Sequence, residues 1–343
     1  MIKNLFREFM ASNLVTRQFY ESARDFYHRA RKLMFFLYDA KQTFNDMHWD
    51  SNSKRNYWAV SAELLFQYHK LEKGLCMPGV KRFFGYNPAK ATIELLNIWR
   101  KGGYSTEDPI YKGAIETLVA YRERIKETPP ERGSQLIQIL DIEISLNPKR
   151  SPELQTPVLA TTSFNENDIY TIEMLTRARR SVRSFSLIEV EMRKIQRAVA
   201  VAQQSPSACN RQPCRVHVYK DRTRINNMLE YQNGNRGFGH TIPLLLVLTA
   251  DATGFFDASE RHEPYIDGGL FAMSLILSLQ AQGLSTCCLN WCVEPFEDNV
   301  AHERGGISVV ERIVMFIAVG YSDDGSLVPR SPRRAIESVM VLH

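Results

Sequence analysis

A proline-rich stretch near the middle of the chain constrains the fold most. The segment SLNPKRSPELQTPVLATTSFN, at 145–165, contains three prolines, has no helical period and is rich in polar residues. Proline fixes φ and removes a backbone donor, so such a segment neither continues a helix nor enters a central strand. We therefore predict a linker at 146–165 between two domains, 1–145 and 166–343, each large enough to bury a core.

The residues before the linker have the periodicity of helices. Apolar and aromatic side chains recur at helical spacing, as in Phe19, Phe26, Leu33 and Leu37, and strand-like alternation is scarce. The predicted helices are 14–48, 55–73, 88–101, 109–128 and 131–145. Residues 1–145 should therefore form an all-helical domain.

The residues after the linker mix helical and strand patterns. Predicted helices are 166–180, 187–203 and 267–282, predicted strands are 215–220, 243–250 and 312–321, and short apolar runs lie at 284–290. Neither a regular βαβ rhythm nor a glycine-rich loop after the first strand is present, which argues against a Rossmann domain. We predict an α+β fold whose mixed, mainly antiparallel sheet is flanked by helices.

Composition is that of a globular protein, with 44% hydrophobic and 24% charged residues. No run approaches the roughly 18–20 apolar residues that span a bilayer, and the N-terminus has no signal-peptide core. We expect a cytoplasmic protein without a transmembrane segment.

Residues 1–160 carry a surplus of basic side chains, about 24 against about 18 acidic ones. This surplus fits an anionic substrate, a membrane surface or nucleic acid, but a solvated helical surface is the interpretation we favour, with no nucleic-acid partner.

The six cysteines are expected to be reduced, because the chain is long and has no export signal. Cys287 and Cys288 are adjacent and would point to opposite faces of a strand. The spacings from Cys209 to Cys214 and from Cys288 to Cys292 lack the CxxC pattern of zinc sites. We predict no metal site.

The segment RARRSVRSFS, at 177–186, marks the first candidate binding site. Arg179, Arg180, Ser181 and Arg183 fit a phosphate or another anion, because guanidinium groups form bidentate, charge-assisted hydrogen bonds that a hydroxyl can supplement. Alone, the cluster is a weak signal, because an arginine run at a helix end is usually solvated or pairs with the helix dipole.

Two later segments are polar in a similar way. In QQSPSACNRQPCRVHVY, at 203–219, a helix breaks at Pro206, and Asn210 and Gln212 precede a strand. This loop fits either the recognition of a flat polar ligand or a plain polar turn. The C-terminal GYSDDGSLVPRSPRRAIESVMVLH carries arginines, Arg333 among them, that fit either a second part of the anion site or a surface tail.

Taken in order, these motifs resemble the nitroreductase family of FMN-dependent oxidoreductases over about 168–343. Members have an RRSxRxF segment, a PSxxNxQPW loop and a glycine-terminated strand followed by an arginine arm. The matching positions here are Arg179 to Phe185, Ser205 to Pro213, Gly320 and Arg333. The segment 265–290 is similar to the family's buried central helix with its GLGT turn. Cys214 departs from the pattern, because the family usually has tryptophan there.

The resemblance implies an FMN site and roles for its residues. Arg179, Ser181 and Arg333 would bind the phosphate and ribityl chain, and Arg183 would lie near the pyrimidine edge of the flavin. Amides of the loop would bind the ribityl chain and ring, against which Pro206 and Ser207 would lie. The implied cofactor-binding residues are Arg179, Arg180, Ser181, Arg183, Pro206, Ser207, Asn210, Gln212, Asn290, Gly320 and Arg333.

The implied activity is ping-pong transfer of electrons from NAD(P)H through FMN to a small-molecule acceptor, in a homodimer with FMN at the interface. The segment 290–298, which contains Asn290 and Glu297, matches only loosely the family loop whose residues contact the flavin ring. The alternative is a non-catalytic protein of the same fold, whose basic helical domain docks to a partner or a membrane surface.

The helical half contains one further polar motif, in YHKLEKGLCMPGVKRFFGY at 68–86. His69, Glu72 and Lys73 share one helix face just before a glycine. They fit either a helix C-terminus with cations near its dipole or a polar cluster on the substrate side of a flavin cleft. The motif is similar to the HKxEKGL motif of a nitroreductase-like subgroup that has a helical N-terminal extension and is often encoded with bacterial polysaccharide biosynthesis enzymes. The segment between Asp251 and Asp267 has little room for the helical lid that many family members insert there, so the helical half is the candidate that closes the substrate pocket. The HKxEKGL resemblance suggests a role in polysaccharide biosynthesis.

Overall fold

The computed structural model describes residues 14–49, 56–78, 83–127, 133–160 and 165–343. Before the linker the helices are α2 (Leu14–Asp46), α3 (Tyr57–Cys76), α4 (Tyr86–Lys101), α5 (Pro109–Lys126) and α6 (Ser134–Ser145). Each overlaps a predicted helix, so the helical character of this region is confirmed. Positions 55, 128, 131 and 132 of the predicted helices lie outside the described residues. So do 1–13, 50–55, 79–82 and 128–132 of the predicted helical domain and 161–164 of the predicted linker.

After the linker, helices and strands alternate irregularly and the α+β fold class is confirmed. The helices are α7 (Glu166–Ala178), α8 (Met192–Ala202), α9 (Arg222–Leu229), α10 (Glu263–Ala281) and α11 (Pro295–Gly305). The strands are β1 (Cys214–Tyr219), β2 (Leu244–Asp251), β3 (Ser285–Asn290) and β4 (Glu311–Gly320).

Three helices differ from the sequence prediction. The predictions missed α9 and α11 because they are short, and side-chain caps rather than a long apolar period define their starts: Asp221 accepts from the amide of Arg224, and a Glu294–Glu297 capping box opens α11. Helix α8 begins later than predicted: its N-cap, Glu191, has extended dihedral angles, and the Glu191 carboxylate accepts from the Tyr321 hydroxyl at 2.5 Å.

The strands of the described residues form one antiparallel sheet in the order β1-β2-β4-β3. Cys214 at the start of β1 lies opposite Ala250 near the end of β2. Beyond the outer edge of β3, Ser181 forms a parallel bridge to Thr286. β1 and β3 are therefore opposite edges of the sheet.

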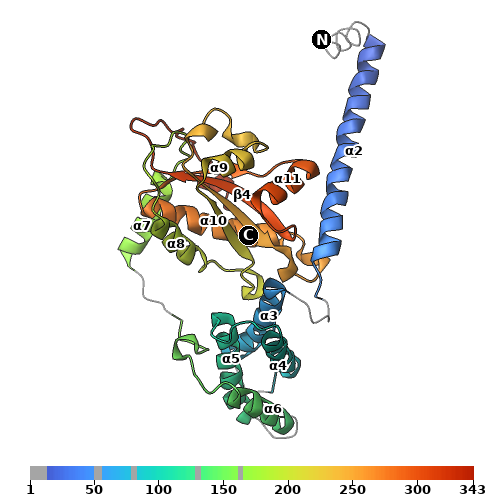
Figure 1. Cartoon of the computed structure of the whole chain (residues 1–343), viewed down its shortest axis with the longest axis vertical. Coiled ribbons are helices and arrows are strands. Elements are labelled where there is room, and N and C mark those ends of the chain that lie inside the picture. The colour runs from blue at the N-terminus through green and yellow to red at the C-terminus, as the bar shows by residue number, and fades with distance from the viewer. Residues whose placement is uncertain (1–13, 50–55, 79–82, 128–132, 161–164) are drawn as a thin grey trace.

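Strand β2 is buried on both faces, which explains its continuous apolar sequence. Leu244, Leu246 and Leu248 contact a core shared with α8 and α10. Leu245 and Val247 contact a second core on the other face, shared with α9 and α11. Figure 1 shows these helix pairs on either side of the sheet.

Helices α3 to α6 pack around a separate core that includes Leu64 and Trp99. Figure 1 shows them as a group of their own, with α3 nearest to the sheet. Helix α2 is attached to the sheet region instead, since its last residue, Asp46, pairs with Arg312 of β4 at 2.7 Å. In the described ranges no helix has both the length and the apolar character needed to cross a membrane.

Replacing Leu64 by alanine should lower the free energy of unfolding by about 2–5 kcal/mol, because the side chain is fully buried and a cavity would remain. Urea unfolding followed by circular dichroism measures the change. Ile142→Ala in α6 is the control, since Ile142 is 63% exposed. Equal losses in the two variants would contradict the assignment of Leu64 to the core.

Candidate functional site

The arginine-rich segment lies at the corner of the sheet where β3 begins and β4 ends. Helix α7 ends at Ala178, and Arg179 leaves it with extended dihedral angles. The amide of Val182 then donates to the carbonyl of Thr286 at 3.0 Å, which fixes the segment along β3. This attachment positions the side chains of the motif beside the edge strand.

Two arginines of this segment lie near Cys287 of β3. Burial raises the pKa of the Cys287 thiol, and the charges of Arg183 and Arg179 and a hydrogen bond with Ser181 oppose that rise. Arg179 is half-buried and Arg183 exposed. Within the described part of the chain neither guanidinium has a carboxylate partner; Arg183 donates only weakly to the carbonyl of Ser181, at 3.4 Å. Two such cations beside a hydroxyl form the donor set that an anion requires.

Other predicted residues near this corner have structural contacts of their own. Arg180 donates to the carbonyls of Arg177 and Arg179, which satisfies the C-terminal end of α7. Gly320 allows the ring of Pro243 to pack closely against the backbone, because a Cβ at this position would lie 2.6 Å from Pro243. Arg333 lies in an exposed tail and donates to the carbonyl of Ser331 at 2.6 Å, so the structure does not join it to Arg179.

The loop at 205–213 is held in an unusual backbone conformation. Cys209, Asn210 and Gln212 have φ values of 52°, 55° and 51°, in the left-handed region that costs side-chain-bearing residues of order 1–3 kcal/mol. The hydroxyl of Ser207 accepts from the amide of Gln212 at 3.0 Å. Both predicted amide side chains are exposed, and that of Gln212 donates to Asn210 at 3.3 Å. They are therefore available to a ligand.

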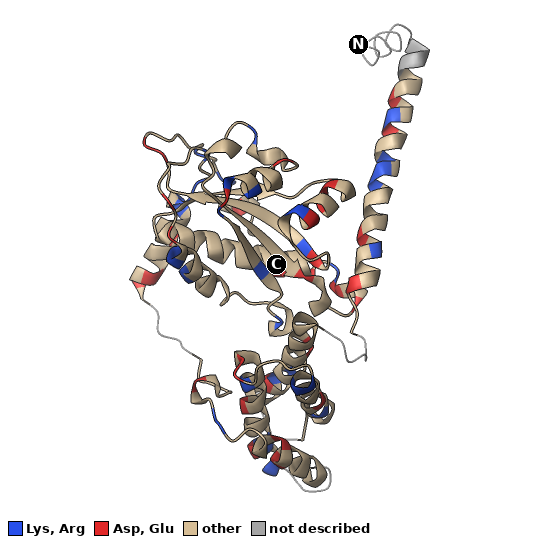
Figure 2. Ribbon diagram, in the orientation of Figure 1, with Lys and Arg blue, Asp and Glu red and all other residues tan. Residues whose placement is uncertain are grey.

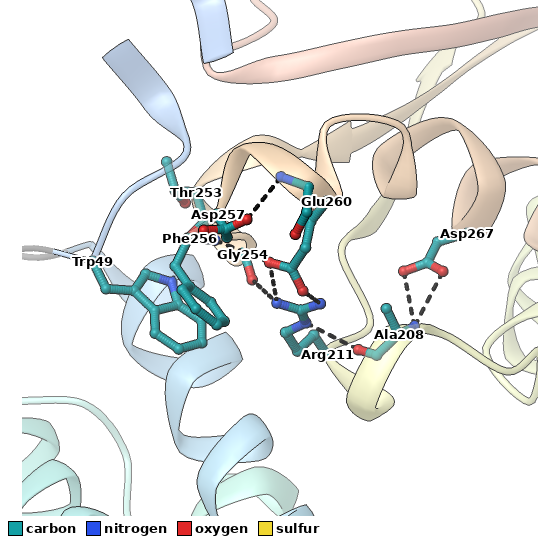
Figure 3. Close-up of polar contacts among 10 residues, drawn as sticks. Trp49, Ala208, Arg211, Thr253, Gly254, Phe256, Asp257, Glu260 and Asp267 are labelled. Atoms are coloured by element: carbon teal, nitrogen blue, oxygen red, sulfur yellow. Dashed lines mark hydrogen bonds and ion pairs between the residues drawn. The ribbon is translucent and has the colours of Figure 1, made fainter. Parts of the chain in front are cut away.

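A buried arginine that was not predicted from the sequence, Arg211, anchors this loop. The Arg211 side chain is fully buried and pairs with both carboxylate oxygens of Glu260, at 2.6 and 3.1 Å. It also donates to the carbonyls of Ala208 and Gly254 at 3.0 and 3.2 Å, as Figure 3 shows. The guanidinium lies over the Phe255 ring, 4.6 Å from its centroid.

Asp267 of α10 is the second missed residue. Both of its carboxylate oxygens accept from the amide of Ala208, at 3.1 and 3.2 Å (Figure 3). Burial raises its pKa to about 6, an effect that the hydrogen bond from Ala208 partly offsets. The sequence did contain a signal for this residue. Asp267 lies at a position of α10 where the helical period otherwise places buried apolar residues, and a buried carboxylate needs a specific partner.

A pocket of about 130 Å³ separates this loop from the helical region. Its walls include Tyr57 and Trp58 of α3, together with Pro206, Gln212 and Asp267. The predicted contribution of the helical half to a pocket at the loop therefore has a structural counterpart in α3.

The His69 motif lies further along the same helix. The His69 Nδ1 and the Glu72 carboxylate are 3.0 Å apart, and Lys73 is exposed in the last turn. Burial lowers the pKa of the neighbouring Lys70, which Cys209 of the loop partly offsets. The motif thus lies close to the loop, although its three residues do not line the pocket.

Asn290 is exposed at the end of β3. Its side chain donates to the sulfur of Cys292 at 3.3 Å, and its carbonyl accepts from Gln232 at 2.8 Å. Glu297, by contrast, accepts from the amide of Glu294 as a helix cap. Both side chains therefore have partners within the protein; that of Asn290 is exposed along β3, whereas that of Glu297 caps a helix.

The arginine corner and the loop lie far apart in one chain. Thr286 is level with the start of β2, whereas Cys214, after the loop, is level with its end. Three strand spacings and five to six residues along β2 separate them, which amounts to roughly 22–25 Å. The two groups of predicted residues therefore occupy diagonally opposite corners of the sheet.

Cysteine positions agree with the predicted strand geometry, since Cys287 is buried and Cys288 is exposed. All six cysteines are free. No group of three or more His, Cys, Asp or Glu side chains in the described residues is arranged to hold a metal ion.

Comparison with known proteins gives one family match. Residues 176–232 and 223–321 match the model of the nitroreductase family. This part of the chain, after the helical region, is therefore similar to nitroreductases. Comparison with curated proteins gave no match.

Solved structures similar to this nitroreductase-like half include three bacterial proteins. An FMN-dependent nitroreductase from Clostridium difficile is 21% identical, with a TM-score of 0.40, over 45% of this chain and 90% of that one. A nitroreductase family protein from Streptococcus pneumoniae is 20% identical, with a TM-score of 0.43, over 50% and 100%. One from Clostridium novyi is 18% identical, with a TM-score of 0.41, over 44% and 85%.

Asp267→Asn should change how stability depends on pH. Because the folded-state pKa of about 6 exceeds the usual value near 4, the folded protein binds this proton more tightly than the unfolded chain. The carboxyl therefore makes the free energy of unfolding fall as pH rises from about 4 to 6. Urea unfolding across this range should show a flatter dependence in Asp267→Asn, and no change in the exposed control Asp324→Asn. An unaltered slope in Asp267→Asn would contradict the assignment.

Proposed function

We propose that the chain is an FMN-dependent, NAD(P)H-linked oxidoreductase that reduces a small-molecule acceptor. The observation that carries the proposal is the pair of guanidiniums, Arg179 and Arg183, that have no carboxylate partner among the described residues. They flank Ser181 at the positions of the RRSxRxF motif, inside the region that matches the nitroreductase family.

The chemistry of these residues fits a phosphorylated flavin. Arg179 and Ser181 would hold the phosphate by charge-assisted hydrogen bonds. Arg183 would lie toward the pyrimidine edge of the ring, where a preorganised cation stabilises the negative charge that reduction develops. Bound FMN would supply the hydride-transfer chemistry between NAD(P)H and the acceptor. Asn210 and Gln212, with exposed amides on a rigid loop, would orient the ribityl chain and ring.

A complete site would need two copies of the chain, because the arginine corner and the loop are roughly 22–25 Å apart within one copy. Exposed apolar side chains next to the loop support a homodimer, since Ile266, Leu270 and Met273 of α10 are each about half exposed. Ser274, the next residue of α10, accepts from the hydroxyl of Ser205 in the loop at 2.7 Å. An apolar contact there would bring the loop of one copy to the arginine corner of the other.

The pocket beside α3 would then admit the acceptor. His69, Glu72 and Lys73 lie further along α3 and do not line the pocket, so they would contact the acceptor where it extends beyond the pocket. A role in polysaccharide biosynthesis rests on the HKxEKGL resemblance alone and stays a prediction.

Arg179→Ala should weaken FMN retention by about 1.5–3 kcal/mol, the usual contribution of a hydrogen bond to a charged group. Arg333→Ala should do the same if the tail reaches the phosphate. Fluorescence titration of the flavin-free protein with FMN measures both. Arg177→Ala is the matched control, because that arginine is exposed and pairs only distantly with Glu173, at 4.0 Å.

Purified protein should also show flavin absorbance. Colourless protein that gains no flavin signal when FMN is added would refute the proposal and favour the non-catalytic alternative. Unchanged FMN affinity in both Arg179→Ala and Arg333→Ala would place the anion site elsewhere.

Substitution of His69 or Lys73 by alanine should lower the rate at which acceptors reoxidise the flavin, with FMN still bound. Stopped-flow reoxidation with a panel of quinone and nitroaromatic acceptors measures this rate, and flavin absorbance measures retention. Lys101→Ala, at the end of α4, is a control in the same helical region. If His69→Ala and Lys73→Ala change only the thermal stability, the motif is a helix terminus and not part of the site.

A further inference from the structure

Helix α2 carries an apolar repeat that the sheet region leaves uncovered. Phe19, Ala23, Phe26, Ala30, Leu33, Leu37, Ala40 and Phe44 follow one another at alternating spacings of four and three residues. We call these eight residues the α2 seam. All of them are exposed, and its three phenylalanines are 72%, 74% and 85% exposed. A strict alternation of this kind is the pattern of a coiled coil.

The seam points away from the rest of the molecule. Helix α2 contacts the sheet region through Arg31, Tyr38 and Asp46, which pair with Glu294, Asp298 and Arg312. At 3.6 residues per turn, these three side chains lie on roughly the opposite side of the helix from the seam. Figure 1 shows α2 standing beside the sheet region, with its N-terminal half clear of it.

The charges of α2 favour a protein partner over a membrane surface. Figure 2 shows charged residues of both signs along the helix. Asp25 and Asp39 are interspersed with basic residues such as Arg29 and Lys32. An interfacial membrane helix would instead have a polar face that is mainly basic.

We propose that the α2 seam pairs with the α2 seam of a second copy of this chain in an antiparallel, two-stranded coiled coil. In antiparallel order the seam is complementary to itself, since every seam residue has a seam partner. Phe19 lies opposite Phe44, and Phe26 lies opposite Leu37. In the same register Ala30 lies opposite Leu33, and Ala23 lies opposite Ala40.

The residues that flank the seam fit the same register. Arg29 would lie across from Phe36, and Lys41 across from Tyr20, so that each cation faces an aromatic ring and not another cation. Phe36 is 70% exposed in the single chain. No like charges therefore oppose one another along these two flanks.

The area available is sufficient for a specific contact. A buried phenylalanine contributes about 150 Å² or more, so three phenylalanines and two leucines from each copy would bury on the order of 1,300 Å² in total. This falls within the range of stable, specific interfaces, about 1,200–2,000 Å². The pairing is independent of flavin binding, because the seam lies on the far side of α2 from the sheet region.

The test compares the full-length protein with Phe26→Glu/Leu37→Glu, which places two carboxylates opposite each other in the seam. Analytical ultracentrifugation over a concentration series should show that the variant dissociates to a smaller assembly. The protein concentration at which it dissociates should be at least about tenfold higher than for the wild type. Both positions are exposed and glutamate favours helix, so the fold should persist, as circular dichroism would verify. The matched control, Arg24→Glu/Lys32→Glu, alters two exposed positions of α2 outside the seam and should behave as the wild type.

The outcomes separate this pairing from the proposed oxidoreductase function. Loss of assembly in the seam variant with FMN still bound supports the coiled coil. An unchanged assembly in the seam variant overturns it and leaves the flavin proposal intact. A wild-type protein that stays monomeric at all concentrations also overturns it, and points to a different partner for α2.

Cysteine cross-linking tests the orientation. Oxidation of a mixture of Ala23→Cys and Ala40→Cys proteins should give a cross-linked dimer above the background of the wild-type cysteines. Ala23→Cys alone should not, because in the antiparallel register the two copies of residue 23 are 17 residues, about 25 Å, apart along the helix axis. Efficient linking of Ala23→Cys to itself would overturn the antiparallel arrangement.

Discussion

The buried ion pair between Arg211 and Glu260 connects the parts of the molecule on which a binding site depends. It ties the loop at 205–213 to the turn that follows β2, and the same guanidinium lies 5.5 Å from the Phe66 ring of α3. An arginine with no exposed surface requires such partners, because an unpaired charge in this position would be strongly destabilising. The loop, the sheet region and the helical region are thus fastened at one charged group.

Much of the architecture could be predicted from periodicity. The long helices α2 to α6 and the strands β1, β2 and β4 have apolar patterns that identify them without any knowledge of their neighbours. The short helices α9 and α11 were missed, because side-chain caps define their starts rather than a long apolar stripe. At the late start of α8 the N-cap Glu191 accepts a hydrogen bond from Tyr321, over a hundred residues away, which no local pattern reveals.

The predicted site residues were brought together only in part. Arg179, Ser181 and Arg183 lie side by side, as the compact motif suggested, but the Asn210 loop is at the opposite corner of the sheet. Order along the chain does not determine which edges of a sheet two motifs occupy, so this separation could not be deduced from sequence. Arg211 was overlooked for a related reason, since arginine is rarely buried and nothing in the local pattern marks it as inward-facing.

The loop itself alternates in direction, with Asn210 and Gln212 outward and Arg211 inward. Its length is therefore under tighter constraint than its composition. An insertion or deletion of one residue before Arg211 would shift the guanidinium into solvent and leave Glu260 without its partner, while an amide entered the core. Substitutions at the outward positions would leave this anchor intact. We therefore expect this loop to tolerate substitutions of its exposed side chains but not insertions or deletions.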